Sequence, residues 1–196
     1  MQLETKRLIL RKYKKSDWKD LVEGVGNYDV AKMLTMIPYP YTRKNAEEYI
    51  QKRAKKWKEK PVTDYVFVVE LKSEKKVIGS IGLHNINFFH GVGTTGSWIN
   101  KKYWRNGYNT EAKIAINDFA FNKLGLRRIE SGAFPNNKAS NAVQLYVGYK
   151  FEGIKRNNIK CMATGKIQSE NIYGLMKEDW KKKRPILIKE LNKKIK

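Results

Sequence analysis

The segment from Gly93 to Gly125 constrains the fold most, because it contains a strand, a short loop and a helix in direct succession. We expect the strand at residues 94–99 and the loop at residues 100–109. Thr110 is predicted to cap the helix that follows, and Gly125 to end it. This helix is the clearest element of the chain, since its apolar residues recur at the spacing of one buried helical face. They are Ala112, Ala115, Ile116, Phe119 and Ala120.

A strand that leads through a glycine-containing loop into a helix directs several unpaired N–H groups and a partial positive charge to one point. A phosphate group fits such a point. Arg105, close to Gly107 in the loop, adds a side-chain cation. An ordinary strand–helix connection with a glycine in its turn fits the same pattern, so this segment alone does not establish an anion site.

The composition indicates one compact and highly basic domain. The chain has 196 residues, with 41 Lys and Arg against 19 Asp and Glu, which gives a formal net charge of +22. This charge favours polyanionic partners, namely a phosphorylated cofactor, RNA or a ribonucleoprotein, and disfavours cationic small molecules as substrates. For most of these lysines and arginines, an ordinary solvated surface is the better explanation.

A single cysteine, Cys161, excludes an internal disulfide, and two histidines offer no Cys/His cluster, so no metal site is expected. A reducing compartment inside the cell is the simplest context. Residues 1–10 lack the apolar core of a signal peptide, and no segment approaches the ~20 apolar residues of a membrane span. We therefore expect a cytoplasmic protein without membrane contact.

The rest of the chain alternates between strand and helix patterns. Further strands are expected at residues 5–12, 65–69, 77–83, 127–134 and 172–176 and from residue 149, and further helices from residue 16, at 42–60 and at 138–147. Residues 24–40 predict a short helix or an irregular loop, and the basic segment 177–196 has helical spacing. The alternation predicts a mixed sheet with helices on its faces.

Three separated motifs resemble one known family. Residues 104–112, WRNGYNTEA, resemble the acetyl-CoA-binding loop of the GNAT acetyltransferase superfamily, in particular of its ribosomal-protein N-terminal alanine and serine acetyltransferases. Residues 137–140 (NKAS) and 148–153 (GYKFEG) resemble the Asn-x-x-Ser helix and the following strand of that branch. Residues 3–11 resemble its first strand, so the resemblance covers nearly the whole chain.

The resemblance implies an α/β (α+β) fold of one GNAT domain, with a mixed, mostly antiparallel twisted sheet of about six to seven strands and helices on both faces. We assign residues 1–180 to this domain and residues 181–196 to a basic C-terminal tail, which is expected to be helical. The resemblance also implies acetyl-CoA as the cosubstrate. The residues that it assigns to acetyl-CoA binding are Trp98, Ile99, Arg105, Asn106, Gly107, Tyr108, Asn109, Thr110, Asn137 and Ser140.

The chain departs from the family pattern at three positions. Arg105 stands where relatives often have glycine and Asn109 where a small residue is usual, so a tighter or shifted loop is expected. Phosphate contacts there come mostly from main-chain amides, which changed side chains can preserve. Many GNAT enzymes have a tyrosine near the departing sulphur, and Gln144 stands at that position. Tyr146 lies two residues on and, at about 100° per residue, points elsewhere.

The resemblance implies direct transfer of an acetyl group from the thioester to an amine. Ser140 is expected to donate a hydrogen bond to the departing sulphur, and a weak donor suffices because a free thiol has a pKa of about 8.5. A main-chain N–H of residues 96–99 is expected to polarise the thioester carbonyl. Asn137 is expected to orient the pantetheine arm, which is compatible with capping its helix.

The general base is the least determined role. Thr95 lies on the strand where relatives often have a glutamate. His84, at the end of the preceding strand, has a side-chain pKa suited to the task and is the candidate catalytic base. The alternatives are a structural hydrogen bond of His84, and proton relay through water from an N-terminal amine with a pKa of about 8.

We therefore expect an N-acetyltransferase that transfers the acetyl group of acetyl-CoA to a primary amine, first of all the N-terminal α-amino group of a protein such as a ribosomal protein. The basic surface favours association with the ribosome or RNA. One alternative is acetylation of a small amine, such as an amino sugar, a polyamine or an antibiotic. Another is a non-catalytic RNA- or ribosome-binding module on the same fold.

Two groups of residues bear on the acceptor. Acidic side chains, which a cationic acceptor needs, are few in the acceptor-side segments: Glu23, Asp29, Glu47 and Glu48. An apolar, aromatic patch is the expected place for acceptor contacts, although core packing explains such a patch more often. It consists of Met33, Leu34, Met36, Tyr39 and Tyr41.

Overall fold

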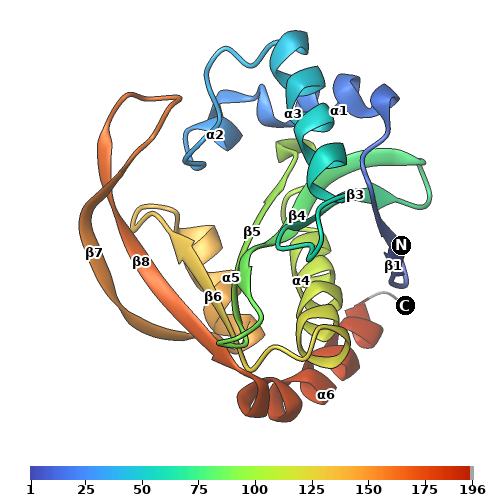
Figure 1. Cartoon of the computed structure of the whole chain (residues 1–196), viewed down its shortest axis with the longest axis vertical. Helices are drawn as coiled ribbons and strands as arrows, with labels where there is room; N and C mark the ends of the chain where they lie inside the picture. The colour runs from blue at the N-terminus through green and yellow to red at the C-terminus, as the bar shows by residue number, and fades with distance from the viewer. Residues whose placement is uncertain (195–196) are drawn as a thin grey trace.

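The computed structural model describes residues 1–194, which form one open sheet with helices on both faces (Figure 1). The strands lie in the order β1-β2-β3-β4-β5-β6-β8-β7. They are β1 (Gln2–Glu4), β2 (Leu8–Arg11), β3 (Tyr65–Leu71), β4 (Lys76–Asn87), β5 (Val92–Ile99), β6 (Arg128–Ala133), β7 (Lys150–Lys160) and β8 (Ile167–Met176). The α-helices are α1 (Trp18–Val25), α2 (Tyr28–Ala31), α3 (Arg43–Lys56), α4 (Tyr108–Asp118), α5 (Lys138–Val147) and α6 (Lys177–Lys194).

Within the described residues, neighbouring strands are antiparallel except β5 and β6, which are parallel. This confirms the mixed, mostly antiparallel sheet, but the described part of the chain forms an 8-stranded sheet and not one of six to seven strands. The extra strand is β1, which precedes the strand predicted at residues 5–12, whereas β2 lies within that predicted range. The buried carboxylate of Glu111 accepts hydrogen bonds from the Thr5 hydroxyl and the Arg7 main-chain N–H, which holds a turn between β1 and β2.

The helices cover the two faces of the sheet unequally (Figure 1). On one face, α1 and α3 pack on a core that includes Leu21, Ile50 and Val68. On the other face, α4, α5 and α6 pack on a larger core that includes Phe67, Ile116 and Leu187. The second core holds the predicted inner face of α4, on which Ala112, Ile116, Phe119 and Ala120 are buried and Ala115 is partly buried.

The start of α4 differs from the prediction. The helix begins at Tyr108, and the residue before it, Gly107, is the N-cap in a left-handed conformation with φ 76°. Thr110 therefore lies inside the first turn and does not cap the helix. At the other end, a π-helical turn (Phe119–Lys123) leads to Gly125, whose φ is 71°, and this confirms the predicted end.

Helices α3 and α5 begin as the sequence predicts. The Thr42 side chain accepts a hydrogen bond from the main-chain N–H of Asn45 and caps α3. This helix ends at Lys56 and not near residue 60, because the indole of Trp57 turns to the sheet and donates to the carbonyl oxygen of Val66 at 3.3 Å. α5 has the predicted bounds, with Asn137 as its N-cap and Gly148 as its left-handed C-cap.

The parallel pair β5–β6 separates part of the way along the sheet. The last paired residues are Thr95 on β5 and Ser131 on β6, whereas β5 continues to Ile99 and β6 to Ala133. We call this point the fork. Figure 1 shows β5 and β6 diverging beyond it. The fork opens the middle of the sheet and leaves main-chain groups of β5 without a strand partner.

The long hairpin of β7 and β8 bends so that its tip reaches the segment after α2 (Figure 1). The main-chain N–H of Met162 donates to the carbonyl oxygen of Thr35 at 3.0 Å, and the thiol of Cys161 donates to that of Leu34 at 3.3 Å. These bonds connect the β7–β8 hairpin, near the C-terminal end of the chain, to the segment after α2 in its N-terminal part.

The predicted C-terminal tail is helical as far as the structure describes it. Trp180 and Leu187 of α6 are each 1% exposed. Residues 195 and 196 of the predicted tail lie outside the described residues, and the division of the chain at residue 180 stays a prediction. None of the helices in residues 1–194 combines the length and apolar character that a membrane span needs.

Candidate functional site

The first turn of α4 presents free main-chain amides. The N–H of Glu111 makes the first bond of the helix, to the carbonyl oxygen of Gly107 at 3.0 Å. By helix geometry, the amides of Tyr108, Asn109 and Thr110 lie before that bond and have no partner inside the helix. Together with the positive end of the helix dipole they have the arrangement that favours an anion, and the anion site at this loop stays a prediction.

The loop before α4 is held by a residue that the sequence analysis missed. The guanidinium of Arg7 donates to the carbonyl oxygen of Asn106 at 3.0 Å and lies 4.4 Å from the centre of the Tyr108 ring. Its Nε also donates to Glu111 at 2.7 Å. Arg105 is exposed and has a φ of 64°, so its side chain is available to an anion while its backbone takes a conformation that favours glycine.

Ile99 and Trp98 differ in their relation to this loop. The indole N–H of Trp104 donates to the carbonyl oxygen of Ile99 at 2.7 Å, which ties the end of β5 to the loop. The Trp98 ring lies on the other face of the sheet, against Gly24 of α1, where an added Cβ would lie 2.5 Å from the ring. The structure therefore brings Ile99, but not the Trp98 side chain, to the loop residues.

The main chain of β5 directs donors into the fork. The N–H of Asn100 donates to the carbonyl oxygen of Ile78 on β4 at 2.8 Å. Because the amides of a strand alternate between its two sides, Ser97 and Ile99 direct their N–H groups away from β4 and towards the fork. Two donors of the kind expected from residues 96–99 are thus present.

Buried polar side chains line the base of the fork. Gln144 of α5 donates to the Ser131 hydroxyl at 2.5 Å, and this hydroxyl donates to the carbonyl oxygen of Thr95 at 3.2 Å. Among the described residues, the Oγ1 atom of Thr95, the Oε1 atom of Gln144 and the Oδ1 atom of Asn109 are buried without a hydrogen-bond partner. Buried polar atoms are costly to leave unpaired, so these atoms fit a ligand that carries amides and hydroxyls.

The α5 residues lie as the sequence predicts. The Asn137 side chain accepts a hydrogen bond from the Ser140 N–H at 3.1 Å, which is the capping role. The Ser140 side chain is partly exposed, and its hydroxyl has no hydrogen-bond partner within residues 1–194. Tyr146 points away from the fork, since its hydroxyl donates to Glu190 of α6.

His84 lies on the face of the sheet that carries α1 and α3. Its Nδ1 atom is 3.1 Å from a carboxylate oxygen of Asp64, and an added Cβ at Gly82 would lie 3.0 Å from its Nε2 atom. Burial lowers the pKa of His84, although the hydrogen bond to Asp64 acts in the opposite direction. Asp64 was absent from the predicted site, because a contact between a loop and a strand end has no local sequence signal.

The acidic side chains on the acceptor side are paired with basic ones. Hydrogen bonds from Lys102 and Lys76 lower the pKa of Glu23 to about 2. Asp29 is bound by Lys101 and Lys32, and these hydrogen bonds lower its pKa to about 2. Two further pairs lie along α3, namely Glu47 with Arg43 and Glu48 with Lys44.

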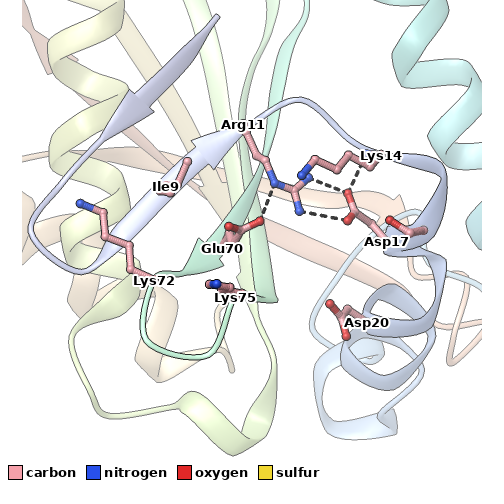
Figure 2. A pocket seen from close by; sticks show the side chains of 9 residues that line it. Ile9, Arg11, Lys14, Asp17, Asp20, Glu70, Lys72 and Lys75 are labelled. Carbon is pink, nitrogen blue, oxygen red and sulfur yellow. Dashed lines mark hydrogen bonds and ion pairs between the residues drawn. The ribbon is translucent and has the colours of Figure 1, made fainter.

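One hollow lies elsewhere on the molecule. It has a volume of about 430 Å³, and none of the predicted site residues lines it. Figure 2 shows the Arg11 guanidinium at its centre, bound to Glu70 of β3 and to Asp17 at the start of α1. Since Arg11 occupies Asp17 and Glu70, and the Asp20 carboxylate accepts from the main-chain N–H of Val77, this hollow is explained as the junction of β2, β3 and α1.

Comparison with known proteins agrees with this geometry. The acetyltransferase (GNAT) domain family matches residues 7–150. YoaA, an uncharacterized N-acetyltransferase of Bacillus subtilis (strain 168), is 30% identical over 175 residues, which are 89% of this chain and 96% of YoaA.

Two solved structures share the fold at lower sequence identity. The ribosomal-protein-S5-alanine acetyltransferase of Vibrio fischeri has a TM-score of 0.78 at 21% identity, over 92% of this chain and 98% of that one. Mycobacterium smegmatis RimJ, in complex with CoA-disulfide, has a TM-score of 0.83 at 16% identity, over 98% of this chain and 93% of that one. Fold, family match and sequence relative agree, and the chain therefore belongs to the GNAT family of acetyl-CoA-dependent N-acetyltransferases.

Proposed function

We propose that the acceptor of this acetyltransferase is the N-terminal α-amino group of a protein, with ribosomal proteins as the first class to test. The observation that carries the proposal is the pairing of Glu23, Asp29, Glu47 and Glu48 with lysines and arginines. A polyamine or an aminoglycoside would need free carboxylates to bind its charges. An α-amine has a pKa of about 8 and is partly neutral at physiological pH, so it needs no such carboxylate.

In this proposal, the residues of the fork have separate roles. The amides of Tyr108, Asn109 and Thr110, with Arg105 and Asn106 beside Gly107, bind the pyrophosphate of acetyl-CoA, which supplies the activated acetyl group. The orphaned oxygen atoms of the fork and Asn137 receive the pantetheine arm. The N–H groups of Ser97 and Ile99 offer the donor that polarises the thioester carbonyl.

Ser140 is the proposed donor to the departing sulphur. Its hydroxyl lies on the first turn of α5 without another partner among the described residues, and α5 borders the fork through Gln144. Thiolate is a tolerable leaving group, so a single hydroxyl suffices as the acid. The expected loss on replacing Ser140 with alanine is a fall in kcat with acetyl-CoA affinity retained.

The acceptor is proposed to approach from the side of α2. Met36 and Tyr39 of the predicted patch are 73% and 50% exposed, whereas Tyr41 is 8% exposed and belongs to the core. Tyr39 packs edge-on against Tyr28 of α2, with ring centres 4.9 Å apart. Exposed apolar side chains of this kind suit a peptide better than a highly charged small molecule.

Binding and acceptor class can be tested separately. Acetyl-CoA at about one hundred times its dissociation constant should raise the free energy of unfolding by ~2.7 kcal/mol. Thiol release is then compared for peptides that begin with Ala, Ser or Met and for spermidine and an aminoglycoside. We expect kcat/KM for the best peptide to exceed that for the small amines by ~10-fold or more. A preference for spermidine or the aminoglycoside would contradict the proposed acceptor.

The net charge of +22 supports association with a polyanionic particle such as the ribosome. If the surface acts in this way, acetylation of a protein on intact ribosomes should fall steeply as salt rises, whereas acetylation of a neutral peptide should change little. Equal salt dependence for both acceptors would contradict the role of the basic surface in binding the ribosome. The proposal that the acceptor is a protein α-amine would still stand.

A further inference from the structure

His84 and Asp64 form a polar pair on the face of the sheet opposite α4. The Asp64 carboxylate can only accept hydrogen bonds, so the contact of 3.1 Å requires the proton of the neutral imidazole to lie on Nδ1. The Nε2 atom then carries a free lone pair. Asp64 and His84 are 16% and 29% exposed, so the pair is shielded but open on one side.

The free Nε2 atom lies over Gly82 of β4, close to Val66 of β3. An added Cβ at Gly82 would lie 3.0 Å from Nε2, which places the imidazole directly above this glycine. Gly82 is paired across the strands with Gly96, which follows Thr95 on β5. At Gly96 an added Cβ would meet no atom within 4 Å. The imidazole therefore lies over the strand partner of Gly96, and the space over Gly96 itself is open.

Since side chains alternate along a strand, Thr94, Gly96 and Trp98 share the face of His84. Thr95 points to the other face, towards Ser131 and α5. A group that enters over Gly96 would thus meet the fork from the side opposite α5. This is the arrangement that a transfer between two substrates in one opening requires.

We propose that His84 is the catalytic base that takes the proton of the acceptor amine through Nε2, and that Asp64 is the residue that positions it. This proposal rests on the proposed function, because it needs an amine that loses a proton during acetyl transfer. Gly96, where an added Cβ would meet no atom within 4 Å, provides the room in which the amine reaches both Nε2 and the thioester.

The proton balance is complete with the groups named. The ammonium form of the acceptor gives one proton to Nε2 of His84, and the neutral nitrogen attacks the thioester carbon. The C–N bond forms and the C–S bond breaks, and the electron pair leaves with sulphur. The second nitrogen proton reaches the sulphur by way of the Ser140 hydroxyl, which yields the thiol. His84 finally returns its proton to solvent.

The surroundings of His84 act on its charge in two directions. Burial lowers the pKa of His84, and so does the positive charge of Arg53 on α3, whereas Asp64 raises it. A lowered pKa keeps the imidazole neutral, and therefore able to accept a proton, at physiological pH. The guanidinium of Arg53 lies over the Tyr49 ring, 4.8 Å from its centre.

The test combines kinetics with NMR titration. The sequence has 2 histidines, so the imidazole signals of His84 can be assigned with the variant His90→Gln. Replacing Asp64 with asparagine should lower the pKa of His84 measured in the free protein, and the acid limb of kcat/KM should move to lower pH by the same amount. The variant His84→Gln should lose ~10²–10⁴-fold in kcat/KM, the usual size of a general-base contribution.

The controls separate this proposal from a structural role and from the proposed function. The Asp64→Asn and His84→Gln variants should keep the stabilisation by acetyl-CoA. His90→Gln, in the exposed turn between β4 and β5, should keep wild-type kinetics. Rates are measured with whichever amine releases CoA, so a wrong acceptor class contradicts only the proposed function. Wild-type kcat/KM in His84→Gln would overturn the proposal that His84 is the catalytic base. An acid limb of kcat/KM that does not follow the measured pKa of His84 would overturn it as well.

Discussion

The Nε atom of Arg7 lies 2.7 Å from the Oε2 atom of Glu111, and this ion pair joins the turn after β1 to the first turns of α4. The Glu111 side chain is 0% exposed, whereas that of Arg7 is 24% exposed. Since Arg7 also binds the carbonyl oxygen of Asn106, one side chain fixes both the helix and the loop before it. The geometry of the proposed pyrophosphate site thus depends on the N-terminus of the chain.

The variant Arg7→Ala should lose both stability and cofactor affinity. It leaves the buried Glu111 carboxylate without its cation, and such a loss costs ~3–5 kcal/mol of unfolding free energy. Urea unfolding measures this change, and calorimetry should show weaker binding of acetyl-CoA. The control Lys44→Ala removes a cation from an exposed pair and should cost less than ~1 kcal/mol. Equal costs for the two variants would contradict the role assigned to Arg7.

The left-handed conformation of Gly107 should matter for binding more than for folding. An alanine at this φ of 76° costs ~1–2 kcal/mol of backbone strain, and relief of that strain would move the amides of the following turn. Gly165, between β7 and β8, has a φ of 68°, and an added Cβ meets no atom within 4 Å there and no atom closer than 3.6 Å at Gly107, so Gly165→Ala is a matched control. We expect similar losses of stability but weaker acetyl-CoA binding for Gly107→Ala alone. Unchanged affinity of Gly107→Ala for acetyl-CoA would contradict the proposal that this loop binds the pyrophosphate.

Lys113 of α4 should make stability depend on pH. Its side chain is 1% exposed without a hydrogen-bond partner among the described residues, and burial lowers its pKa from 10.5 to about 8. Between these two values the unfolded chain holds a proton that the folded chain has lost, so the contribution of Lys113 to stability rises with pH. Below this range both states are protonated, and the folded state bears the cost of a buried charge.

The variant Lys113→Met should therefore be more stable than the wild type at pH 7, by ~1–4 kcal/mol. This gain should shrink as the pH rises from about 8 to 10.5. Urea unfolding of both proteins at several pH values measures the difference, in which the titrations of other groups cancel. A gain that does not change with pH would show that Lys113 is not charged at neutral pH.

The single cysteine reports on the contact between the β7–β8 hairpin and the segment after α2. Cys161 is 0% exposed, and its thiol is bound to the carbonyl oxygen of Leu34. We expect a disulfide reagent to modify the native protein at least ~100-fold more slowly than the urea-unfolded protein, because modification requires the hairpin to open. Equal rates would mean that the tip of the hairpin is not docked in solution.

The elements that were predicted well are those with local signals. Asn137 and Gly148 mark both ends of α5, and Thr42 marks the start of α3, because caps act within a few residues of the chain. The capping role of Thr110 was wrong, since Gly107 takes the left-handed conformation and starts the helix earlier. A threonine near a helix start and a glycine in the preceding loop can each be the N-cap, and their order in the sequence does not decide between them.

The contacts that the sequence could not reveal join distant segments. Arg7 and Glu111 are 104 residues apart, and Asp64 and His84 are 20 apart, so neither pair leaves a periodic pattern. The unpredicted strand β1 depends on a contact of the same kind, because Glu111 holds the turn between β1 and β2. The resemblance identified the loop and α5 as cofactor-binding, whereas the orphaned Thr95 and Gln144 oxygen atoms become apparent only when the fork is assembled.

The most direct measurement uses a peptide that begins with alanine and contains one internal lysine. The peptide is incubated with acetyl-CoA and the enzyme, and tandem mass spectrometry locates the acetyl group. The proposed function predicts one acetyl group on the α-amine, in an amount equal to the CoA released. Acetylation of the lysine side chain, or release of CoA only with a small amine, would contradict it.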